Sequence, residues 1–509
     1  MHKIAVLIRQ ADQVLQDGLI SRIDGREEKA ISSIWCKRKR NMRLYFFCCL
    51  VLSLFVFLIC HVVLPNKLLS VLPDHETVKS PIRSQYNLIK ESFQALPQTV
   101  QTNPCDGRRV FMYDLPSKFN ADLLQKCEYG VVSWLNFCYH ASNDGLGQSH
   151  ENVSEETSMG KGWYNTDAYM LEVIFHSRMR RYSCLTNNSE AADAFFVPYY
   201  TGIDALRYLY AIEKKNVHMD KHGADLVAWL EHNGSSRWQQ YAGKDHFMVM
   251  GRTSWDFVYS DAIRGAGWGT GISHLPHIVN MSTLLIEKRP WAEHEQAVPY
   301  PTSFHPSFSE LQTWINKVRN AKRPYLFAFA GGMRPTMQDT TIRTRLLIQC
   351  SKSVSCMPVD CGKLKCSHNP KPIATAFLQS EFCLQPRGDT PTRRSAFDAM
   401  IAGCIPVFFH EDSAYTQYTW HLPKDPDSYS VFISEEDVRN GLQIERLLKS
   451  YSQDRIRQMR NTISEVMPKL LYVNPYSAGK DFNVTDAFDI SIAGVLQRIS
   501  KLKQQLSKL

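Results

Sequence analysis

The sequence predicts an α/β protein, in which a pair of Rossmann-type domains follows a single transmembrane helix and a stem. Three observations support this prediction. A chain of 509 residues is long enough for about three domains. Residues 44–64 form one uninterrupted apolar segment. Residues 105–509 alternate short apolar runs with helical stretches, a pattern typical of βαβ units.

The composition is that of a globular protein, because 44% hydrophobic and 21% charged residues exclude a disordered or low-complexity chain. The formal net charge of +9 is concentrated near the N-terminus, where residues 1–43 carry ten Lys or Arg and five Asp or Glu. The remaining residues hold 49 basic and 45 acidic side chains. We therefore expect no nucleic-acid partner, since binding nucleic acid requires a concentrated basic surface.

Residues 44–64 contain no charged side chain. As a helix, these 21 residues would span roughly 30 Å, the thickness of a membrane's hydrocarbon core. A cleaved signal peptide would have a shorter apolar stretch nearer the N-terminus, and a core helix would not be expected beside the cations from Lys37 to Arg43. The positive-inside rule places residues 1–43 in the cytosol. The segment is therefore predicted to be a signal-anchor that leaves the body of the chain in a lumen.

Residues 65–104 combine several prolines with polar residues and show little sustained periodicity, so we interpret them as a stem. Every Asn-x-Ser/Thr sequon lies beyond the anchor, which supports a luminal, glycosylated body. These sequons begin at Asn152, Asn187, Asn233, Asn280 and Asn483.

Ten of the fourteen cysteines lie in the body, and an oxidising lumen favours disulfides. Cys350, Cys356, Cys361 and Cys366 are separated by five, four and four residues. Zinc ligands are usually paired at spacings of two to four residues. We therefore favour local disulfides over a metal site and leave their connectivity open.

Several apolar runs in the body are continuous, as expected for parallel strands covered on both faces. Strands are predicted at 110–113, 194–199, 247–250, 277–279, 325–330, 381–384, 405–409 and 430–433. Helices are predicted at 167–177, 309–320 and 435–451. The charged segment 317–324 is the expected boundary, which gives two α/β halves at 105–320 and 321–509.

The most informative segment is 382–409, FCLQPRGDTPTRRSAFDAMIAGCIPVFF. It predicts a strand, a turn permitted by Gly388, a helix and a second strand. Thr390 fits the N-cap position of this helix, and Pro391 fits its first helical position. A helix N-terminus that follows the carboxyl end of a strand offers N–H groups and a positive dipole end to a phosphate.

Arginines accompany this helix start, and a guanidinium group suits a diphosphate. Arg394, Ser395 and Asp398 share a helix face by their spacing, so the carboxylate could accept hydrogen bonds from ribose hydroxyls. From these residues alone, the alternative is a surface ion pair between Arg394 and Asp398 with solvated neighbours. The predicted nucleotide-diphosphate site comprises Arg387, Gly388, Asp389, Arg393, Arg394, Ser395 and Asp398.

This segment, together with VFMYDLP (110–116), FFVPY (195–199), YPTSFHP (300–306) and SAYTQYTWHLP (413–423), resembles the exostosin family of glycosyltransferases, family 47. Within that family it is most similar to the plant xyloglucan galactosyltransferase group of the katamari/murus type. The resemblance implies a GT-B-like pair of Rossmann-type domains, with 105–320 on the acceptor side and 321–509 binding the nucleotide sugar. It also implies a type II Golgi membrane protein that transfers galactose from UDP-galactose to xyloglucan xylose with inversion.

Inverting transfer needs a general base for the acceptor hydroxyl and positive charge near the leaving UDP. Arg393 and Arg394 would supply that charge, so the motifs require neither a metal nor a cofactor besides the donor. The candidate bases are His305 and Asp204, which follow strand-like segments of the first half, where open α/β folds bind ligands. Asp256, in TSWDF (253–257), is a third candidate. For each of the three, a capping role or a buried hydrogen bond is the alternative.

Two further features concern the substrates. Asp425-Pro426-Asp427 is interpreted as a turn rather than as a metal site. Trp255, Trp268 and Trp291 lie in the aromatic- and Gly-rich stretch 251–306, which we favour as acceptor-facing because flat rings stack on sugars. Core packing is the alternative for each tryptophan.

The donor segment would bind the UDP part of any donor, so the motifs do not identify the sugar. The alternatives are transfer of galacturonic acid, arabinose or xylose to a wall polysaccharide, and a non-catalytic carbohydrate-binding or organising protein of the Golgi. A receptor ectodomain would not require an arginine-lined turn between strand and helix. Complexes with other Golgi glycosyltransferases are a further expectation.

Overall fold

The structure is a computed structural model. It describes residues 104–150, 159–209, 221–258, 269–332, 341–364, 366, 369–476 and 485–507. The predicted cytosolic tail (1–43), the transmembrane segment (44–64) and the stem up to residue 103 lie outside the described residues. A search of the part that is described finds no helix with the length and apolar character needed to cross a membrane.

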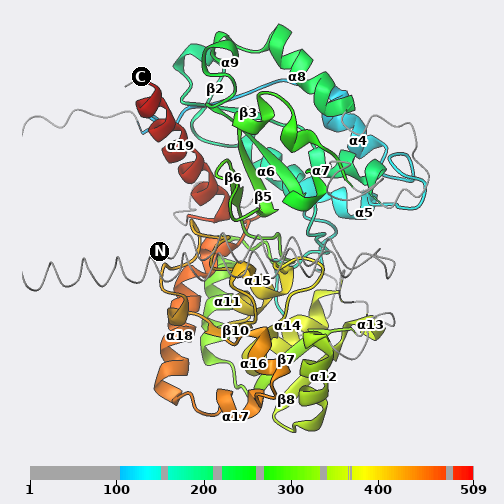
Figure 1. Cartoon of the computed structure of the whole chain (residues 1–509), viewed down its shortest axis with the longest axis vertical. Helices are drawn as coiled ribbons and strands as arrows, with labels where there is room; N and C mark the ends of the chain where they lie inside the picture. The colour runs from blue at the N-terminus through cyan, green and yellow to red at the C-terminus, as the bar shows by residue number, and fades with distance from the viewer. Residues whose placement is uncertain are drawn as a thin grey trace, which may run out of the picture. The chain divides into compact units, whose positions relative to one another are not determined.

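The first half is built on a six-stranded, fully parallel sheet with the strand order β2-β1-β3-β4-β5-β6 (Figure 1). The helices α6 (Leu171–Met179) and α7 (Thr201–Asp204) pack on β4. The strands are β1 (Val110–Met112), β2 (Leu185–Thr186), β3 (Ala194–Val197), β4 (His246–Thr253), β5 (Ser282–Glu287) and β6 (Glu295–Ala297). The strands predicted at 110–113, 194–199 and 247–250 are confirmed.

The strand predicted at 277–279 is wrong. His277 has a φ of +67°, in the left-handed region, and the next residues form the 3-10 turn Ile278–Asn280. The strand is instead β5, which is buried along its whole length. The helix predicted at 167–177 begins later, at Leu171.

The second half is built on a five-stranded parallel sheet with the order β11-β10-β9-β7-β8. If the five strands are numbered 1 to 5 along the chain and the sheet is followed from β8 to β11, the order is the doubly wound arrangement 2-1-3-4-5. Its topological switch point lies between β7 and β9. The strands are β7 (Tyr325–Gly331), β8 (Cys356–Asp360), β9 (Ser380–Gln385), β10 (Ile405–Phe408) and β11 (Val431–Phe432). The four strands predicted in this half are confirmed, whereas β8 was not predicted.

The helices of the second half include α12 (Ile342–Lys352), α14 (Pro370–Leu378) and α15 (Arg394–Ile401). The single helix predicted at 435–451 is two helices, α16 (Glu435–Arg439) and α17 (Ile444–Leu448). Gly441 separates them with a φ of +94°, a conformation that glycine adopts without steric cost.

The expected boundary at 317–324 lies between the last strand of the first sheet and the first strand of the second. However, α11 (Phe308–Asn320) shares a hydrophobic core with the second half. Its Trp314 packs in the cluster that contains Ala328 of β7, and the indole Nε1 donates to the Ile401 carbonyl at 2.9 Å. The core of the second half therefore begins with α11.

The chain crosses back to the first half after α18 (Gln453–Val466), and α19 (Ala487–Leu506), red in Figure 1, lies beside the first sheet. The Phe488 ring lies 4.7 Å from the Phe175 ring of α6. Near the other end of α19, Lys503 Nζ donates to the Asp193 carbonyl at 2.8 Å. The C-terminal helix is therefore part of the packing of the first half.

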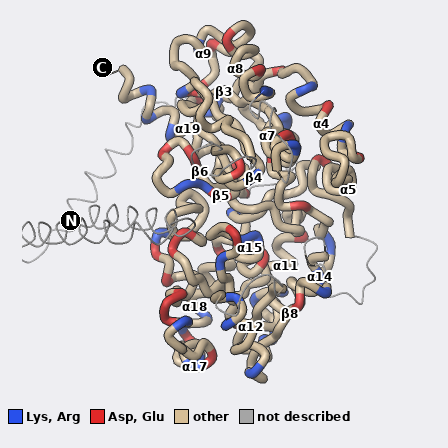
Figure 2. The backbone as a smooth tube through the Cα atoms, turned by 45° about the vertical axis from the view of Figure 1, so that its right-hand side comes forward, with Lys and Arg blue, Asp and Glu red and all other residues tan. Residues whose placement is uncertain are grey.

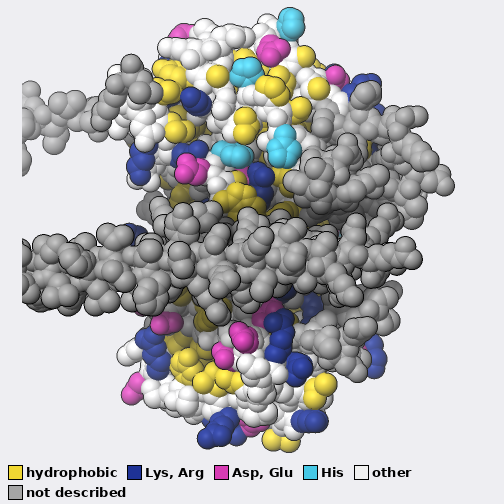
Figure 3. Space-filling view, viewed as in Figure 1, with side chains coloured by type: hydrophobic (Ala, Val, Ile, Leu, Met, Phe, Trp, Pro, Cys, Tyr) yellow, Lys and Arg dark blue, Asp and Glu magenta, His cyan; other side chains and the backbone are white. Residues whose placement is uncertain are grey.

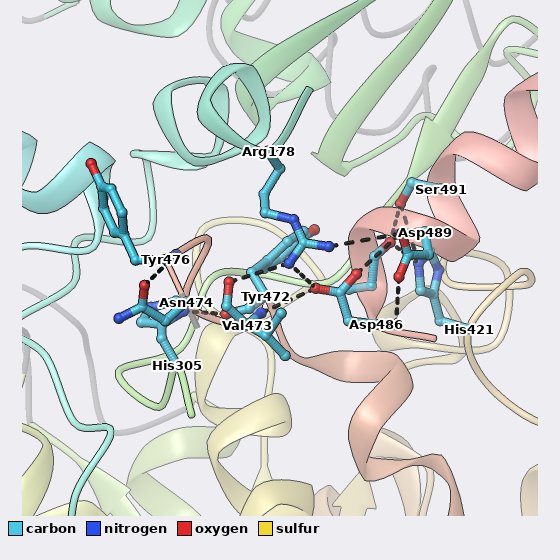
Figure 4. A network of polar contacts seen from close by, with 11 residues as sticks. Arg178, His305, His421, Tyr472, Val473, Asn474, Tyr476, Asp486, Asp489 and Ser491 are labelled. Carbon is cyan, nitrogen blue, oxygen red and sulfur yellow. Dashed lines mark hydrogen bonds and ion pairs between the residues drawn. The ribbon is translucent and has the colours of Figure 1, made fainter. Parts of the chain in front are cut away.

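A buried ion pair secures the start of α19 (Figure 4). Arg178 Nη1 of α6 lies 2.9 Å from Asp486 Oδ2, and the two side chains are 9% and 0% exposed. Asp486 is the N-cap of α19, and its carboxylate also accepts the Val473 N–H at 3.1 Å. Burial raises the pKa of Asp486 to about 7, although Arg178 opposes this shift.

Replacing Arg178 with alanine is expected to lower the free energy of unfolding by about 3–5 kcal/mol, because it leaves a buried carboxylate without its cation. The matched control is Arg457→Ala, since Arg457 pairs with Asp454 on the surface and both side chains are at least 70% exposed. That change should cost less than about 1 kcal/mol. Urea unfolding followed by circular dichroism measures both, and equal losses would contradict the assigned role of Arg178.

The ten body cysteines form five disulfides, so the prediction of local disulfides in the 350–366 cluster is confirmed. Two of them, Cys350–Cys356 and Cys361–Cys366, join neighbours within that cluster. The others are Cys105–Cys184, Cys127–Cys138 and Cys383–Cys404. The last joins the residues before and after α15 and so ties β9 to the start of β10.

Charges of both signs are interspersed along the chain in both halves (Figure 2). The face shown in Figure 3 carries both basic and acidic side chains. This distribution agrees with the near balance of charge in the body of the sequence.

Candidate active site

A cleft of about 750 Å³ is lined by residues of both halves. The first half contributes the residues that precede α6 and those at the end of β4, including Asp167, Tyr169, Arg252 and Asp256. The second half contributes the carboxyl ends of β7 and β9 with the helices that follow them. The cleft therefore lies at the switch point of the second sheet, where doubly wound folds bind ligands.

Two strand-to-helix turns of the second half meet in this cleft. Gly331 and Gly332 line it at the end of β7, and Arg343 lines it from the first turn of α12. A Cβ at Gly332 would lie 3.1 Å from the Gly362 backbone nitrogen, so the backbones approach closely here. None of these residues was predicted to be part of the site, although two glycines directly after a predicted strand are a usable signal.

The start of α15 differs from the prediction. The helix begins at Arg394 with Arg393 as its N-cap, rather than at Pro391 with Thr390 as the cap. Thr392 is held outside the helix because both its N–H (2.9 Å) and its hydroxyl donate to Glu287 Oε2 of β5. A contact from a distant strand thus overrides the local capping signal.

Arg393 lines the cleft, and its Nε donates to the Pro386 carbonyl at 3.3 Å. Its guanidinium group packs over Gly388, where a Cβ would lie 1.1 Å from Arg393 Nη2. Gly388, whose φ lies outside the left-handed region, leaves room for this guanidinium group. Arg387 does not line the cleft. Its side chain is 46% exposed, and its Nε lies 3.1 Å from Glu435 Oε1 of α16. The predicted donor role of Arg387 is not retained.

Arg394 connects the two halves. Its Nη1 donates to the Thr166 carbonyl at 2.7 Å, and its Nη2 donates to Ser303 Oγ at 2.6 Å. Its Nε lies 3.6 Å from Asp398 Oδ2, and the arginine side chain is only 18% exposed. The ion pair considered as a surface feature thus exists, but it is largely buried in the wall of the cleft.

The other predicted donor residues also line the cleft, namely Asp389, Ser395 and Asp398. Ser395 Oγ donates to Gln385 Oε1 at 2.6 Å, which ties the helix to the end of β9. Burial raises the pKa of Asp398, and the neighbouring Arg394 opposes the shift. The structure therefore brings most of the predicted donor segment together at one wall.

Two of the three candidate bases, Asp204 and His305, are buried and form hydrogen bonds with residues that do not line the cleft. Asp204 is 2% exposed, and its carboxylate accepts the Tyr199 hydroxyl at 2.8 Å and lies 2.9 Å from His222 Nδ1. His305 is 1% exposed, and its Nδ1 lies 2.5 Å from the Tyr472 carbonyl (Figure 4). Its Nε2 lies 2.9 Å from Thr166 Oγ1.

Neither residue lines the cleft. Burial lowers the pKa of His305 to about 4, with a smaller contribution from Arg394 in the same direction. The alternative of a structural role therefore fits His305 and Asp204 better than the role of base that was predicted.

Asp256 is the candidate base that lines the cleft. It ends the 3-10 turn Ser254–Asp256 directly after β4, and its Oδ2 lies 3.8 Å from Arg252 Nη1. Arg252 is fixed in turn, because its Nε donates to the Gly202 carbonyl at 2.8 Å and its guanidinium group lies 4.2 Å from the centre of the Tyr169 ring.

A second carboxylate that the sequence analysis missed, Glu172, supports this wall from behind. It is 2% exposed and accepts the N–H groups of Gly202 (2.6 Å) and Gly251 (2.9 Å). Burial raises the pKa of Glu172 to about 8. Glu172 thus links the segment that contains Gly202 with the segment that contains Gly251 and Arg252. No local sequence pattern around residue 172 predicts this role.

The stretch 251–306 does contribute to the cleft, through residues such as Tyr300, Thr302 and Phe304. Its tryptophans are placed differently. Trp255 and Trp291 pack edge to face at 6.0 Å and do not line the cleft, while Trp268 lies outside the described residues. The indole that does line it is Trp163, which packs in a tilted arrangement against Phe304 with the ring centres 4.9 Å apart.

The other predicted features that fall within the described residues do not line the cleft. Asp425 caps the 3-10 turn Pro426–Ser428 through Asp427 N–H at 3.1 Å, as expected for a turn. Among the sequons, Asn187 and Asn233 are exposed and Asn280 is half-buried, with its Nδ2 donating to the Ala242 carbonyl at 3.0 Å. The other two sequons, at 152 and 483, lie outside the described residues.

A model of the exostosin GT47 domain matches residues 104–449, which include both sheets and the cleft. The chain belongs to this family. The resemblance found in the sequence motifs is therefore confirmed. Among solved structures, the GtfA/B complex aligns with 65% of this chain and 60% of its own, at a TM-score of 0.31 and 8% identity. The fold is therefore described from the two parallel sheets of this structure alone.

Relatives from Arabidopsis thaliana cover most of the chain. Xyloglucan galactosyltransferase MUR3 is 42% identical over 80% of this chain and 64% of its own length, so the match spans slightly under two thirds of that relative. Probable xyloglucan galactosyltransferase GT13 is 41% identical over 81% of this chain and 89% of its own. Xyloglucan-specific galacturonosyltransferase 1 is 40% identical over 78% and 58%, respectively.

Proposed function

We propose that this protein transfers galactose from UDP-galactose to xylosyl side chains of xyloglucan with inversion, in the synthesis of plant cell-wall hemicellulose. The observation that carries the proposal is the cleft itself, in which an arginine-lined helix start at the switch point of one sheet shares the space with a carboxylate, Asp256, of the other half. The similarity to xyloglucan galactosyltransferase MUR3 and to probable xyloglucan galactosyltransferase GT13 supports galactose as the sugar and xyloglucan as the acceptor.

The donor diphosphate is proposed to bind at the start of α15. Arg393 and the N–H groups of the first helical turn offer hydrogen bonds and positive charge to phosphate oxygens. Arg343 approaches the same cleft from α12. As the bond between sugar and phosphate breaks, these groups stabilise the negative charge that develops on UDP. Asp398, one turn into α15, accepts hydrogen bonds from ribose hydroxyls.

The acceptor hydroxyl is proposed to be activated by Asp256. The carboxylate takes the hydroxyl proton while the oxygen attacks the anomeric carbon from the face opposite to UDP, so the new bond is a β-linkage. Arg252 holds the carboxylate in the cleft wall. Tyr169 and Trp163 provide aromatic surface for the acceptor sugars.

The proposal also includes the arrangement of the two halves, the membrane anchor and the location in the Golgi. Two parallel sheets on either side of a cleft support a GT-B-like arrangement, with the acceptor in the first half and the nucleotide sugar in the second. The basic run followed by residues 44–64 supports a single-pass type II anchor in the Golgi membrane with the body in the lumen. Association with other Golgi glycosyltransferases remains a prediction.

Purified protein should transfer galactose from UDP-galactose to xyloglucan oligosaccharides and form β-linked product. The same assay should include UDP-galacturonic acid, UDP-arabinose and UDP-xylose, because a galacturonosyltransferase is 40% identical to this chain. Turnover of another donor without turnover of UDP-galactose would contradict the proposed sugar. No turnover and no UDP binding would favour a carbohydrate-binding or organising role instead.

A further inference from the structure

The carboxyl end of β5 is inserted into the second half. Three consecutive residues, Ile286, Glu287 and Lys288, bond to second-half side chains. The Ile286 carbonyl accepts the Tyr418 hydroxyl at 2.8 Å. The Lys288 N–H donates to Gln417 Oε1 at 2.9 Å, and its carbonyl accepts Gln417 Nε2 at 3.1 Å. These contacts fix Glu287, which lies between them, relative to the second half.

Glu287 is 1% exposed, and donors satisfy both of its carboxylate oxygens. Oε1 accepts the Trp255 indole Nε1–H at 3.1 Å. Oε2 accepts the N–H of Thr392 at 2.9 Å together with the hydroxyl of the same residue. A buried carboxylate with this many matched donors has a fixed orientation, since any rotation would leave charged or polar atoms without partners.

Thr392 directly precedes Arg393 and is part of the cleft wall, whereas Glu287 is not. Because the Thr392 hydroxyl donates to Glu287, its oxygen accepts the Tyr300 hydroxyl at 2.8 Å. Two first-half side chains therefore hold the residue at the entrance to α15. They direct the Thr392 N–H away from any ligand and place the start of the helix at Arg394.

We propose that Glu287 is a positioning residue for the donor: from the acceptor half, it sets Thr392 and thereby presents Arg393 and the first turn of α15 to the diphosphate. The inference rests on the proposed function only in taking a uridine diphosphate as the ligand of that helix start. Glu287 touches neither substrate, and its effect passes through Thr392.

Glu287→Gln tests this role with almost no change in shape. The amide oxygen can accept from one side only, so its NH₂ group faces the donor of either Thr392 or Trp255. In calorimetric titrations of the full-length protein, the Kd for UDP is expected to rise at least about tenfold, since displaced groups that bind a charged ligand lose strong hydrogen bonds. In steady-state assays, KM for UDP-galactose should rise while KM for the xyloglucan oligosaccharide stays within about twofold.

Glu295→Gln is the matched control. Glu295 is also 1% exposed in the first half, but its carboxylate accepts from Ser254 Oγ (2.7 Å) and Arg289, which belong to the same half. This variant loses a buried charged partner in the same way, and its thermal stability should fall. Its Kd for UDP should remain within about threefold of the wild-type value, because the loss does not reach α15.

Thr392→Val provides a second route that keeps Glu287, in case Glu287→Gln does not fold. It should also raise the Kd for UDP. The Kd of the double variant should rise by less than the product of the two single effects, because both changes disturb the same contact between Glu287 and Thr392. Wild-type UDP affinity in the folded Glu287→Gln protein, or equal losses in Glu287→Gln and Glu295→Gln, would overturn the inference. A wild-type protein that binds UDP but does not transfer galactose would instead contradict only the proposed function.

Discussion

Replacing Asp256 with asparagine is expected to lower kcat for galactosyl transfer by about 10²–10⁴-fold, the range typical of removing a general base. The amide preserves the shape of the side chain but cannot accept the hydroxyl proton. The KM for UDP-galactose should change little, because the proposed donor contacts lie on the opposite wall. Initial rates with a xyloglucan oligosaccharide at saturating UDP-galactose measure the effect.

The comparison variant is Asp167→Asn, because Asp167 is the other first-half carboxylate that lines the cleft. Its Oδ1 accepts the Tyr169 N–H at 2.8 Å, so it shapes the segment before α6. We expect this variant to affect the acceptor KM more than kcat. A larger loss of kcat in Asp167→Asn than in Asp256→Asn would transfer the role of base to Asp167.

Replacing Arg393 with alanine is expected to weaken UDP binding by about 10- to 100-fold, because a hydrogen bond to a charged group contributes about 1.5–3 kcal/mol. kcat should fall as well, since the lost guanidinium group would stabilise charge on the departing UDP. Arg393→Lys should recover only part of the loss, because an ammonium group lacks the paired donors of a guanidinium.

Arg387→Ala is the matched control, because this arginine lies six residues earlier in the same segment but pairs with Glu435 outside the cleft. UDP affinity should remain within about twofold of the wild-type value. If Arg387→Ala weakened UDP binding as much as Arg393→Ala, the placement of the diphosphate at the start of α15 would be contradicted.

The secondary structure of the segment proposed to bind the donor could be predicted from the sequence because its signals are local. A strand, a glycine turn and a helix with arginines at its start all lie within 382–409, and the structure assembles them in that order. The exact start of α15 could not be predicted. It depends on Glu287, which is 105 residues from Thr392 in the chain.

Choosing among the candidate bases is harder, because contacts with distant segments decide where each side chain lies. Residues after predicted strands were reasonable candidates, yet the Tyr472 carbonyl, 167 residues from His305, and His222 determine which side chains are occupied. Of the three, Asp256 is the one that lines the cleft. Glu172 and Arg252 likewise owe their positions to contacts between distant segments, which no local pattern encodes.

The strand β5 illustrates a different limit. Its run Leu284–Leu285–Ile286 is as apolar as the strands that were predicted, but the strand was placed at 277–279 instead, where His277 adopts a left-handed conformation. With β5 misplaced, neither Glu287 nor the contact between the halves could be inferred. The correct assignment required the pairing of β5 with β4 and β6.

The most direct test of this account is a crystal structure of the protein with UDP bound. Diphosphate oxygens are expected within about 2.7–3.2 Å of Arg393 and of the N–H groups in the first turn of α15, with the ribose near Asp398. Asp256 should then lie across the cleft on the acceptor side. A diphosphate bound away from α15, or at the ends of the first sheet, would contradict it.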